Sequence, residues 1–307
     1  MKDFGKEIES LRKLSVAELM GRALEKKLAS RGEKFSLCSI INAKSGQCSE
    51  DCKFCVQSAH YKTDISVYPL KDIEEIVLAA QEARSIGAGH FSLVTSGRGM
   101  QGAEVEKVAG IIAAIRSRVD IKVCASLGIL SYDSFMVLKD AGLSRYHHNI
   151  ESSREFFDTI VSTHSFDERI ETIKAAQRAG LEVCAGGIIG LGETEDDRIS
   201  MALTLKECKV DSVPLNILIP LPGTPLEHTA RLSIEEILRA IALFRLIVGG
   251  IPVRLCAGRE SALNDFLGMA FMAGADGMMI GGYLTQRGRS PEADNQLVQD
   301  MKKIWNS

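Results

Sequence analysis

Three cysteines lie within eight residues, in the stretch CSEDCKFC, as Cys48, Cys52 and Cys55. A disulfide framework needs an even number of cysteines in a short secreted chain, and a tetrahedral zinc site needs a fourth ligand nearby. Three thiolates on one loop can instead hold three irons of a [4Fe–4S] cluster and leave the fourth iron open to another ligand. The spacing therefore favours an iron–sulfur site, with a zinc knuckle or three unrelated thiols as the alternative.

The composition is typical of a soluble globular enzyme. The 307 residues are 45% hydrophobic and 25% charged, and 37 basic residues nearly balance 40 acidic ones, so nothing points to nucleic acid or to an anionic membrane. The first ten residues are charged where a signal peptide would be apolar, and no apolar run approaches ~18 residues. We expect a cytoplasmic protein with a small-molecule partner, whose eight cysteines are thiols or metal ligands.

Helical and strand patterns alternate along the chain and must position these cysteines. Residues 3–32 have a helical spacing of apolar residues that predicts one polar helix ending at Gly32, within an N-terminal extension of residues 1–34. Eight short apolar or β-branched runs follow, at residues 35–41, 90–96, 121–126, 145–150, 182–189, 212–219, 252–257 and 277–282. Helix-stop glycines precede several of them, near residues 87, 142, 180 and 274. The pattern predicts a (β/α)8 TIM-type barrel over residues 35–307, with a doubly wound open sheet as the alternative.

The two faces of these strands differ in polarity. Because side chains alternate along a strand, one set should face the lumen of the barrel and the other the surrounding helices. One set is apolar apart from positions such as His148 and includes Phe91, Val123, Tyr146, Val183 and Leu255. The opposite set comprises Cys38, Ser92, Cys124, His147, Asn149, Glu151, Cys184, Asn216, Arg254 and Cys256. A lumen lined by thiols, amides and charges indicates a reaction chamber rather than a stability core.

The C-x3-C-x2-C spacing, with the aromatic Phe54 before the last cysteine, resembles the signature of the radical S-adenosylmethionine superfamily. It also lies directly after the first predicted strand, where a barrel places its active face. The resemblance implies that Cys48, Cys52 and Cys55 bind a [4Fe–4S] cluster whose open iron is chelated by S-adenosylmethionine. An electron from the cluster would then cleave the sulfonium to give a 5′-deoxyadenosyl radical that abstracts hydrogen from an unactivated C–H bond, and a closed lumen would protect that radical.

Five separated blocks closely resemble the biotin synthase family, over roughly residues 35–285. In order they are NAKSGQCSEDCKFCVQS, YHHNIESS, VCAGGIIGLGET, VPLNILIPLPGTPL and VRLCAGRE. The resemblance implies sulfur insertion into dethiobiotin at two unactivated carbons, with two equivalents of S-adenosylmethionine. It also implies an electron-donor protein such as flavodoxin or ferredoxin, and a homodimer.

The same resemblance implies roles for residues around S-adenosylmethionine. Phe54 would lie near the adenine, and Asn149 and Glu151 would bind the ribose, with Asn149 also facing the substrate. Arg169 would sit near the methionine carboxylate, for which a guanidinium is suited, although a solvated helix face is the alternative for this residue.

Two further motifs carry family roles. The residues Gly186, Ile188, Gly190 and Glu193 match the G-x-I-x-G-x-x-E pattern behind the adenine. A role for Glu193 at the start of the following helix fits equally well. Asn216 would offer its amide to the ureido ring of dethiobiotin, whereas a lone strand asparagine is more often a satisfied polar contact.

This chain departs from the family at the auxiliary cluster, which supplies the inserted sulfur. The familiar [2Fe–2S] site uses three strand cysteines and an arginine, and here Cys124, Cys184 and Arg254 match, but the remaining position is Ser92. Serine is a far poorer iron ligand than a thiolate, so the usual site is incomplete.

Two additional cysteines, Cys38 and Cys256, share the inward parity of Cys124 and Cys184. Each alone is more often core filling than a ligand, but four thiols converging on one lumen are what a four-iron cluster needs. We therefore predict a [4Fe–4S]-like auxiliary cluster rather than [2Fe–2S], holding an extra sulfide as the donor. Arg254 then offsets the charge of the cluster without being a ligand.

Two other functions stay open at this point. One is a biotin-synthase-like maturase or mutase that acts on a different small molecule without sulfur insertion. The other is a non-enzymatic zinc or iron–sulfur protein, which the polar lumen disfavours. Cys208, near a helix end, is expected to be an ordinary thiol, and His60, His147 and His148 receive no catalytic role.

Overall fold

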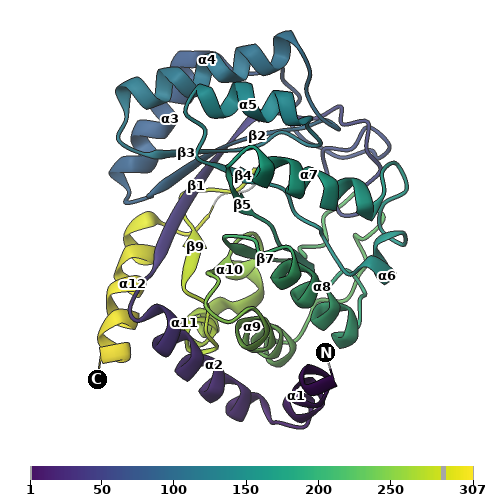
Figure 1. Ribbon diagram of the computed structural model, residues 1–307, viewed down its shortest axis with the longest axis vertical. Helices are drawn as coiled ribbons and strands as arrows, with labels where there is room; N and C mark the ends of the chain where they lie inside the picture. Colours follow the sequence, from purple (N-terminus) through teal and green to yellow (C-terminus); the bar gives the residue numbers. More distant parts are fainter. Residues whose placement is uncertain (1, 285–287, 307) are drawn as a thin grey trace.

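The computed structural model describes residues 2–284 and 288–306, and its strands form one sheet of parallel pairs (Figure 1). The pairing order is β5-β4-β3-β2-β1-β9-β8-β7-β6. The strands are β1 (Ser36–Lys44), β2 (His90–Thr95), β3 (Lys122–Ser126), β4 (Arg145–His147), β5 (Glu182–Cys184), β6 (Gly187–Ile189), β7 (Val213–Ile217), β8 (Val253–Leu255) and β9 (Gly277–Met279).

The two ends of this order, β5 and β6, are separated in the chain only by Ala185 and Gly186. β5 pairs with β4 and β6 pairs with β7, so the run 182–189 occupies one position of a ring of eight strands. Backbone hydrogen bonds continue the pairing on both sides of the break, from His148 N to Cys184 O and from Ala185 N to Ser212 O. The prediction of a (β/α)8 TIM-type barrel is thereby confirmed, with the fifth strand in two pieces.

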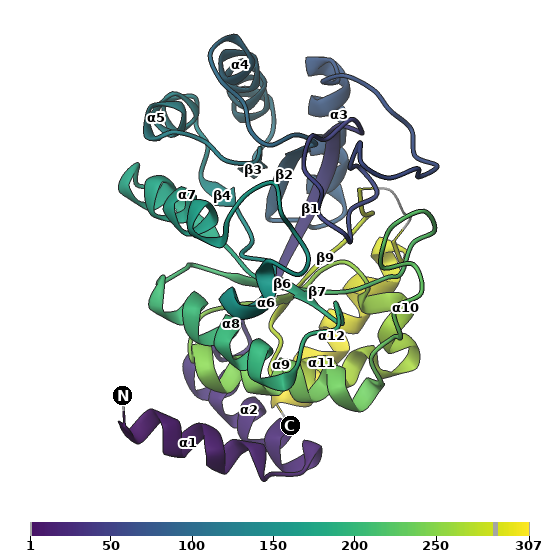
Figure 2. The ribbon, with the colours of Figure 1, turned by 90° about the vertical axis from the view of Figure 1, so that its right-hand side faces the viewer.

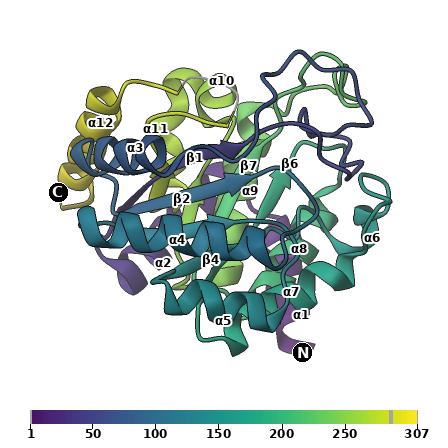
Figure 3. The same ribbon diagram turned by 90° about the horizontal axis from the view of Figure 1, so that it is seen from above.

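Helices follow most strands and surround the sheet, as Figure 2 and Figure 3 show. They are α1 (Lys2–Arg12), α2 (Val16–Arg31), α3 (Ile73–Ser85), α4 (Ala103–Arg118), α5 (Tyr132–Asp140), α6 (Arg154–Phe157), α7 (Phe166–Arg178), α8 (Glu195–Glu207), α9 (Ile234–Val248), α10 (Arg259–Leu263), α11 (Leu267–Met272) and α12 (Pro291–Asn306), with a 3₁₀ turn at Asn264–Phe266. The predicted outward residues of the strands, such as Phe91, Tyr146 and Val183, are buried beneath these helices. The hydrophobic core therefore lies between the sheet and the helices, and the lumen is free for chemistry.

The helix ends follow signals that are present in the sequence. Gly87, Gly142, Gly180 and Gly274 all have positive φ, which closes a helix before the chain enters the next strand. Every predicted strand run contains strand residues, and the first strand extends to Lys44, beyond the predicted end at residue 41.

The prediction of one helix over residues 3–32 is wrong in one respect, because the chain breaks into α1 and α2. Ser15 caps the second helix with a capping box, in which its side chain accepts from Glu18 N while the Glu18 carboxylate accepts from Ser15 N. Gly32 ends α2 at φ +56° as predicted. α2 packs against α9 and α11. The boundary at residue 34 between an extension and the barrel stays a prediction.

None of the helices in residues 2–284 and 288–306 has both the length and the apolar character that a bilayer span requires.

Candidate active site

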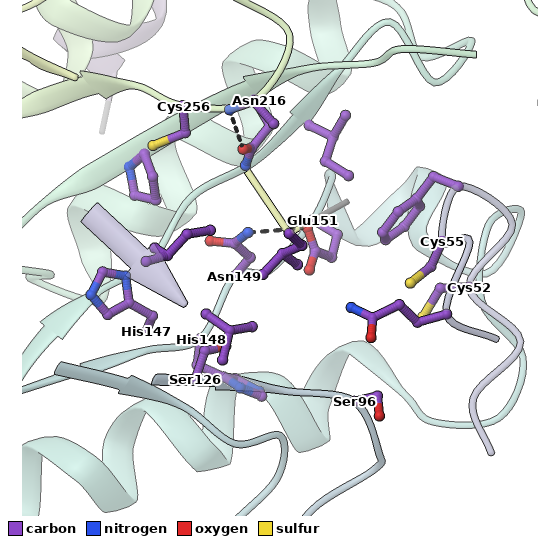
Figure 4. A pocket seen from close by; sticks show the side chains of 18 of the residues that line it. Cys52, Cys55, Ser96, Ser126, His147, His148, Asn149, Glu151, Asn216 and Cys256 are labelled. Carbon is purple, nitrogen blue, oxygen red and sulfur yellow. Dashed lines mark hydrogen bonds between the residues drawn. The ribbon is translucent and has the colours of Figure 1, made fainter. Parts of the chain in front are cut away.

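A cavity of about 440 Å³ opens at the carboxyl ends of the strands and continues down into the lumen (Figure 4). Such a volume is within the range of small-molecule sites. Cys52 and Cys55 lie at one side of the cavity, and Cys256 and His147 lie at the other, with Asn149, Glu151 and Asn216 between them (Figure 4). The active face is thus where the barrel fold predicts it.

The loop after β1 brings the three predicted cluster cysteines to the cavity wall. Cys48, Cys52, Cys55 and Phe54 all line the cavity. Backbone hydrogen bonds from Cys48 N to Gln57 O and from Ala59 N to Cys48 O fold the loop back on itself. Burial raises the pKa of the Cys55 thiol to about 11 and raises that of Cys52 further, so both would become thiolates through bonding to a metal rather than through their protein surroundings.

A polar network that sequence reasoning missed fastens this loop to the segment between α6 and α7. The Glu50 carboxylate, between the first two cluster cysteines, accepts hydrogen bonds from His164 Nδ1 and from Thr163 Oγ1 (2.9 Å), and Arg98 Nη1 lies 3.4 Å away. The neighbouring Asp51 accepts from Ser162 N (2.8 Å). Burial would raise the pKa of Glu50, but its bonds to Thr163 and His164 outweigh burial and lower the pKa. No signal in the sequence pairs residue 50 with residue 164.

Asn149, Glu151 and Arg169 form the middle of the cavity. Arg169, on α7, donates from Nη1 to the backbone oxygen of Asn149 (2.9 Å) and lies 3.7 Å from the Glu151 carboxylate. Both charged side chains are nearly buried, so Arg169 is not on a solvated helix face. Glu151 has φ +65°, an unusual conformation for a side chain of this kind that is more frequent at functional sites. Burial raises the pKa of Glu151, and Arg169 opposes that rise.

The two asparagines also hold the interrupted fifth strand in place. Asn149 Oδ1 accepts from Gly186 N (3.2 Å), while Asn216 Nδ2 donates to Gly187 O (3.2 Å) and Asn216 Oδ1 accepts from Ala257 N (3.1 Å). Each amide has further hydrogen-bonding capacity toward the cavity. A structural role and a ligand-binding role are therefore compatible for both residues.

The G-x-I-x-G-x-x-E residues divide into two groups. Ile188 lines the cavity, whereas Gly186, Gly190 and Glu193 are not among the residues that line it. Glu193 is buried and accepts hydrogen bonds from Gly190 N (2.8 Å) and from Arg198 Nε (2.6 Å). Glu193 therefore fixes the loop before α8, which is the structural interpretation that the sequence left open.

The deep end of the lumen gathers the predicted auxiliary residues. Cys38, Cys184, Cys256, Arg254 and Ser92 line the cavity, and Cys124 is fully buried directly beside Ser92 in the sheet register. Burial lowers the pKa of Arg254, but the four surrounding thiols, Cys38, Cys184, Cys124 and Cys256, outweigh burial and raise it. Three of the four thiols thus line the same cavity as Arg254, and Cys124 lies in register with the cavity-lining Ser92, which agrees with the strand parity.

The polar atoms at this depth fit a group that carries negative charge. Arg254 Nε and Nη1 are buried and have no hydrogen-bond partner among the described residues, and the same is true of His147 Nε2 and Ser92 Oγ. A Cβ at Gly277 would come within 2.9 Å of the Arg254 side chain, so the glycine leaves room for that side chain. Unpartnered buried donors are costly, and an anionic cluster among the four thiols would satisfy them.

In the described ranges, no three His, Cys, Asp or Glu side chains lie close enough to hold a single metal ion. A four-iron cluster instead distributes its ligands over separate irons, so its cysteines need not converge on one point. This finding concerns a single ion and does not bear on a cluster.

The remaining cysteine and histidines lie as follows. Cys208 is half-buried at the end of α8, in an outer groove beside Lys209. His60 bonds the backbone oxygen of Ser49. His148, which the parity argument grouped with the outward residues, lines the cavity and stacks on Tyr146 at 6.1 Å. That assignment is wrong because the regular strand β4 ends at His147, and side-chain alternation ends with it.

Two family models match the chain. The model described as "Radical SAM superfamily" matches residues 44–205, and "Biotin and Thiamin Synthesis associated domain" matches residues 214–303. Among curated proteins, biotin synthase of Pelotomaculum thermopropionicum is 51% identical over 93% of this chain and 89% of its own length. Biotin synthase of Thermotoga petrophila is 48% identical over 88% of this chain and 91% of its own.

Solved structures with the same fold are more distant in sequence. Methylornithine synthase (PylB) has a TM-score of 0.82 at 18% identity and covers 96% of this chain and 92% of its own. The FeFe-hydrogenase maturase HydG from Carboxydothermus hydrogenoformans has a TM-score of 0.79 at 20% identity and covers 97% of this chain and 78% of its own. These similarities concern the fold alone.

Proposed function

The chain belongs to the biotin synthase family, and on this premise we propose how its residues divide the work of sulfur insertion. The chain is a radical S-adenosylmethionine sulfurtransferase that converts dethiobiotin to biotin. When bound, a [4Fe–4S] cluster and S-adenosylmethionine supply the 5′-deoxyadenosyl radical, and an auxiliary cluster supplies the sulfur. The assignments of individual residues are our proposals.

The upper part of the cavity binds the radical-generating group. Cys48, Cys52 and Cys55 hold three irons, and Phe54 lies against the adenine. The observation that supports this assignment is that all three thiols line the cavity that also receives Arg169 and Glu151. The thiols are thus within the same enclosed space as the groups that would bind the nucleoside.

S-adenosylmethionine and dethiobiotin are held by the polar side chains in the middle. Arg169 binds the methionine carboxylate, since a partly buried guanidinium with an unpartnered Nε is suited to it. Asn149 and Glu151 bind the ribose, and Ile188 packs behind the adenine. Asn149 and Asn216 offer their free amide capacity to the ureido ring of dethiobiotin.

Two further members of the adenine motif act indirectly. Gly186 permits the close approach of β7, because a Cβ there would lie 1.9 Å from Pro214 O. Glu193 keeps the following loop in shape through Gly190 and Arg198.

The deep end of the lumen holds a four-iron auxiliary cluster bound by Cys38, Cys124, Cys184 and Cys256. Arg254 offsets the charge of the cluster, which would accept hydrogen bonds from the otherwise unpartnered Arg254 Nε and Nη1. This arrangement differs from three cysteines and an arginine around [2Fe–2S], since Ser92 stands at one ligand position. An extra sulfide held with the cluster would serve as the donor.

The proposed reaction also involves an electron donor, a cellular compartment and an oligomeric state. A reductant is needed, and a flavodoxin or a ferredoxin has the appropriate chemistry. The protein acts in the cytoplasm as a homodimer.

The decisive experiment is an anaerobic assay of reconstituted protein with S-adenosylmethionine, reductant and dethiobiotin. 5′-Deoxyadenosine and biotin are followed by mass spectrometry, after iron and sulfide have been counted. Biotin together with about eight irons per chain, from two four-iron clusters, supports both assignments. 5′-Deoxyadenosine without biotin would contradict the substrate or the sulfur donor while keeping the radical chemistry.

Cys38→Ala and Cys256→Ala test the auxiliary ligands, with Cys208→Ala as the matched control. The first two variants should lose iron and biotin formation, and the control should keep both. Unchanged iron content and product yield in Cys38→Ala and Cys256→Ala would overturn the four-thiol assignment.

A further inference from the structure

A second arginine, Arg145, lies at the same depth as the auxiliary thiols. Its Cα is in register with that of Cys124 on β3, which is in register with Ser92 on β2. Residues in register on neighbouring parallel strands face the same side of a sheet, and this side is the lumen. Arg145 therefore extends inward from β4 and, at 6% exposure, is almost completely buried.

One edge of this guanidinium is occupied and the other is not. Nε and Nη2 of Arg145 donate to the Glu182 carboxylate at 2.9 and 2.5 Å. Nη1 is buried and has no hydrogen-bond partner in the described part of the chain. The ion pair with Glu182 thus leaves one charged donor of this buried guanidinium without a partner among the described residues.

Arg145 and Arg254 lie on different, non-adjacent strands of the barrel wall. The ring of eight strand positions runs β1, β2, β3, β4, the pair β5 and β6, β7, β8 and β9, so β4 and β8 are three positions apart in one direction and five in the other. The proposed ligand cysteines come from β1, β3, β5 and the residue after β8. Arg145 on β4 thus lies between the strands of Cys124 and Cys184, and Arg254 directly precedes Cys256.

His90 on β2 lies two residues before Ser92 and in register with Cys38 on β1. Both His90 ring nitrogens are buried and without a partner among the described residues.

From these contacts we propose that Arg145 is a positioning residue for the auxiliary cluster, donating from Nη1 to a cluster sulfur from a different strand of the wall than Arg254. The inference rests on the proposed ligation by Cys38, Cys124, Cys184 and Cys256. A charge-assisted hydrogen bond to a cluster sulfur withdraws electron density from the cluster. It also helps to retain the extra sulfide, which the four cysteine thiolates do not bind. Arg145 thereby favours the reduced cluster and slows the loss of sulfide before insertion.

A purely structural role for Arg145, in which the ion pair with Glu182 only joins β4 to β5, makes a different prediction. That role depends on the carboxylate, whereas the proposed role depends on the unpartnered Nη1 donor. Glu182→Gln removes the charge partner and keeps the guanidinium, so it is the matched control for Arg145→Gln.

The experiment uses the reconstituted holoenzyme and measures two properties besides turnover. The first is the midpoint potential of each cluster by anaerobic redox titration with EPR detection. The second is the rate at which acid-labile sulfide is lost to an iron chelator. We expect Arg145→Gln to shift the potential of the auxiliary cluster to more negative values and to lose its sulfide about tenfold faster, the loss expected for one charge-assisted bond. The radical-generating cluster should keep its potential.

Arg145→Lys keeps the positive charge and can still pair with Glu182, so it guards against a folding defect in the glutamine variant. We expect a smaller shift in potential than in Arg145→Gln but a similar acceleration of sulfide loss, because the planar donor is absent. Glu182→Gln should change neither property.

The inference fails if Arg145→Gln and Arg145→Lys both have the same auxiliary-cluster potential and the same rate of sulfide loss as Glu182→Gln. Arg145 would then have only a structural role. If the unmodified enzyme holds no auxiliary cluster at all, the proposed ligation fails first and the inference fails with it. The iron count before the titration separates these two results.

Discussion

At the scale of single residues, Ser92 is where this chain differs most from the familiar auxiliary site. Ser92 is buried, lines the cavity and lies in register with Cys124, while its hydroxyl has no partner among the described residues. A thiol at this position would therefore face the same space as the Arg254 guanidinium. Substitutions at Ser92, Cys38 and Cys256 should therefore change which side chains are available to bind the auxiliary cluster.

We predict that the triple variant Ser92→Cys, Cys38→Ser, Cys256→Ser binds a [2Fe–2S] auxiliary cluster in place of the proposed four-iron cluster. Three cysteines and Arg254 would then be available, so total iron should fall from about eight to about six per chain. Iron analysis with Mössbauer spectroscopy measures this change. The double variant without Ser92→Cys is the control and should retain only about four irons. Equal iron in the two variants would contradict the prediction.

Glu50 illustrates a residue whose importance is visible only in three dimensions. Its carboxylate joins the cluster loop to Thr163 and His164, and the residue is buried. Hydrogen bonds to a charged group contribute about 1.5–3 kcal/mol each, so the loop depends on this carboxylate for its shape.

We predict that Glu50→Gln weakens the hold of the loop on the radical-generating cluster, with iron loss in the first cluster and slower cleavage of S-adenosylmethionine. Glu168→Gln is the matched control, because Glu168 contacts the same Arg98 from a more exposed position. EPR of the reduced protein with S-adenosylmethionine reports the first cluster separately from the auxiliary one. Identical spectra for both variants would show that the network is dispensable.

The residues that the sequence identified and those that it missed differ in a physical way. Cys48, Cys52 and Cys55 are close in the chain, so their spacing alone indicates a shared ligand. Strand parity likewise predicts that Cys38 and Cys184 face one lumen, because the alternation of a strand is regular. The contact between Glu50 and His164 joins two irregular loops, for which no periodicity exists.

At the scale of elements, the fifth strand shows where regular structure yields to the site. The ladder stops between β5 and β6, and Asn149 Oδ1 accepts the hydrogen bond of Gly186 N that a backbone oxygen would otherwise accept. The sequence run EVCAGGII predicts one continuous strand there. The hydrogen bond from Gly186 N to the Asn149 side chain, which replaces a backbone hydrogen bond of the sheet, cannot be deduced from that run. In contrast, the break between α1 and α2 was available to sequence reasoning, since Ser15 and Glu18 form the S-x-x-E capping signature.

We predict that Gly186→Ala destabilises the fold by about 1–3 kcal/mol or more and lowers the affinity for S-adenosylmethionine, because overpacking forces the strands apart. A Cβ at this position would meet Pro214 O at 1.9 Å. Gly110→Ala on α4 is the control, since its Cβ would meet nothing within 4 Å. That substitution should stabilise the helix by roughly 0.5–1 kcal/mol. Denaturant unfolding of both variants checks the sign, and equal stabilities would contradict the prediction.

At the scale of the whole molecule, buried charges close the barrel at the end opposite the site. Asp276 is fully buried, accepts from Arg245 Nη2 (3.0 Å) and from Arg31 Nε (2.6 Å), and also accepts from Val253 N. Arg31 belongs to α2 and Arg245 to α9, so one carboxylate joins the N-terminal helix to the barrel. A buried pair of this kind costs about 3–5 kcal/mol when one partner is removed. The N-terminal helices are therefore bound to the barrel by specific charge pairing as well as by apolar packing.

Lys27 joins α2 to the C-terminal helix α12 in the same region. Its ammonium group donates to Gly32 O (2.7 Å) and lies 2.9 Å from the centre of the Trp305 ring. Burial lowers the pKa of Lys27 from 10.5 to about 8, although Asp276 opposes the change. The folded state therefore releases this proton at lower pH than the unfolded chain does.

This difference fixes the sign of a pH effect on stability. Between pH 8 and 10.5 the unfolded chain binds more protons at this position than the folded chain, so the contribution of Lys27 to the free energy of unfolding increases as the pH rises. We predict that the stability of the unmodified protein relative to Lys27→Met increases between pH 7.5 and 10, because the penalty of burying a charge disappears. Subtracting the variant cancels the other titrating groups, and urea unfolding at the two pH values measures the difference. A constant difference would mean that Gly32 and Trp305 stabilise the charge as well as water does, and that the junction of α2 with α12 is insensitive to this proton.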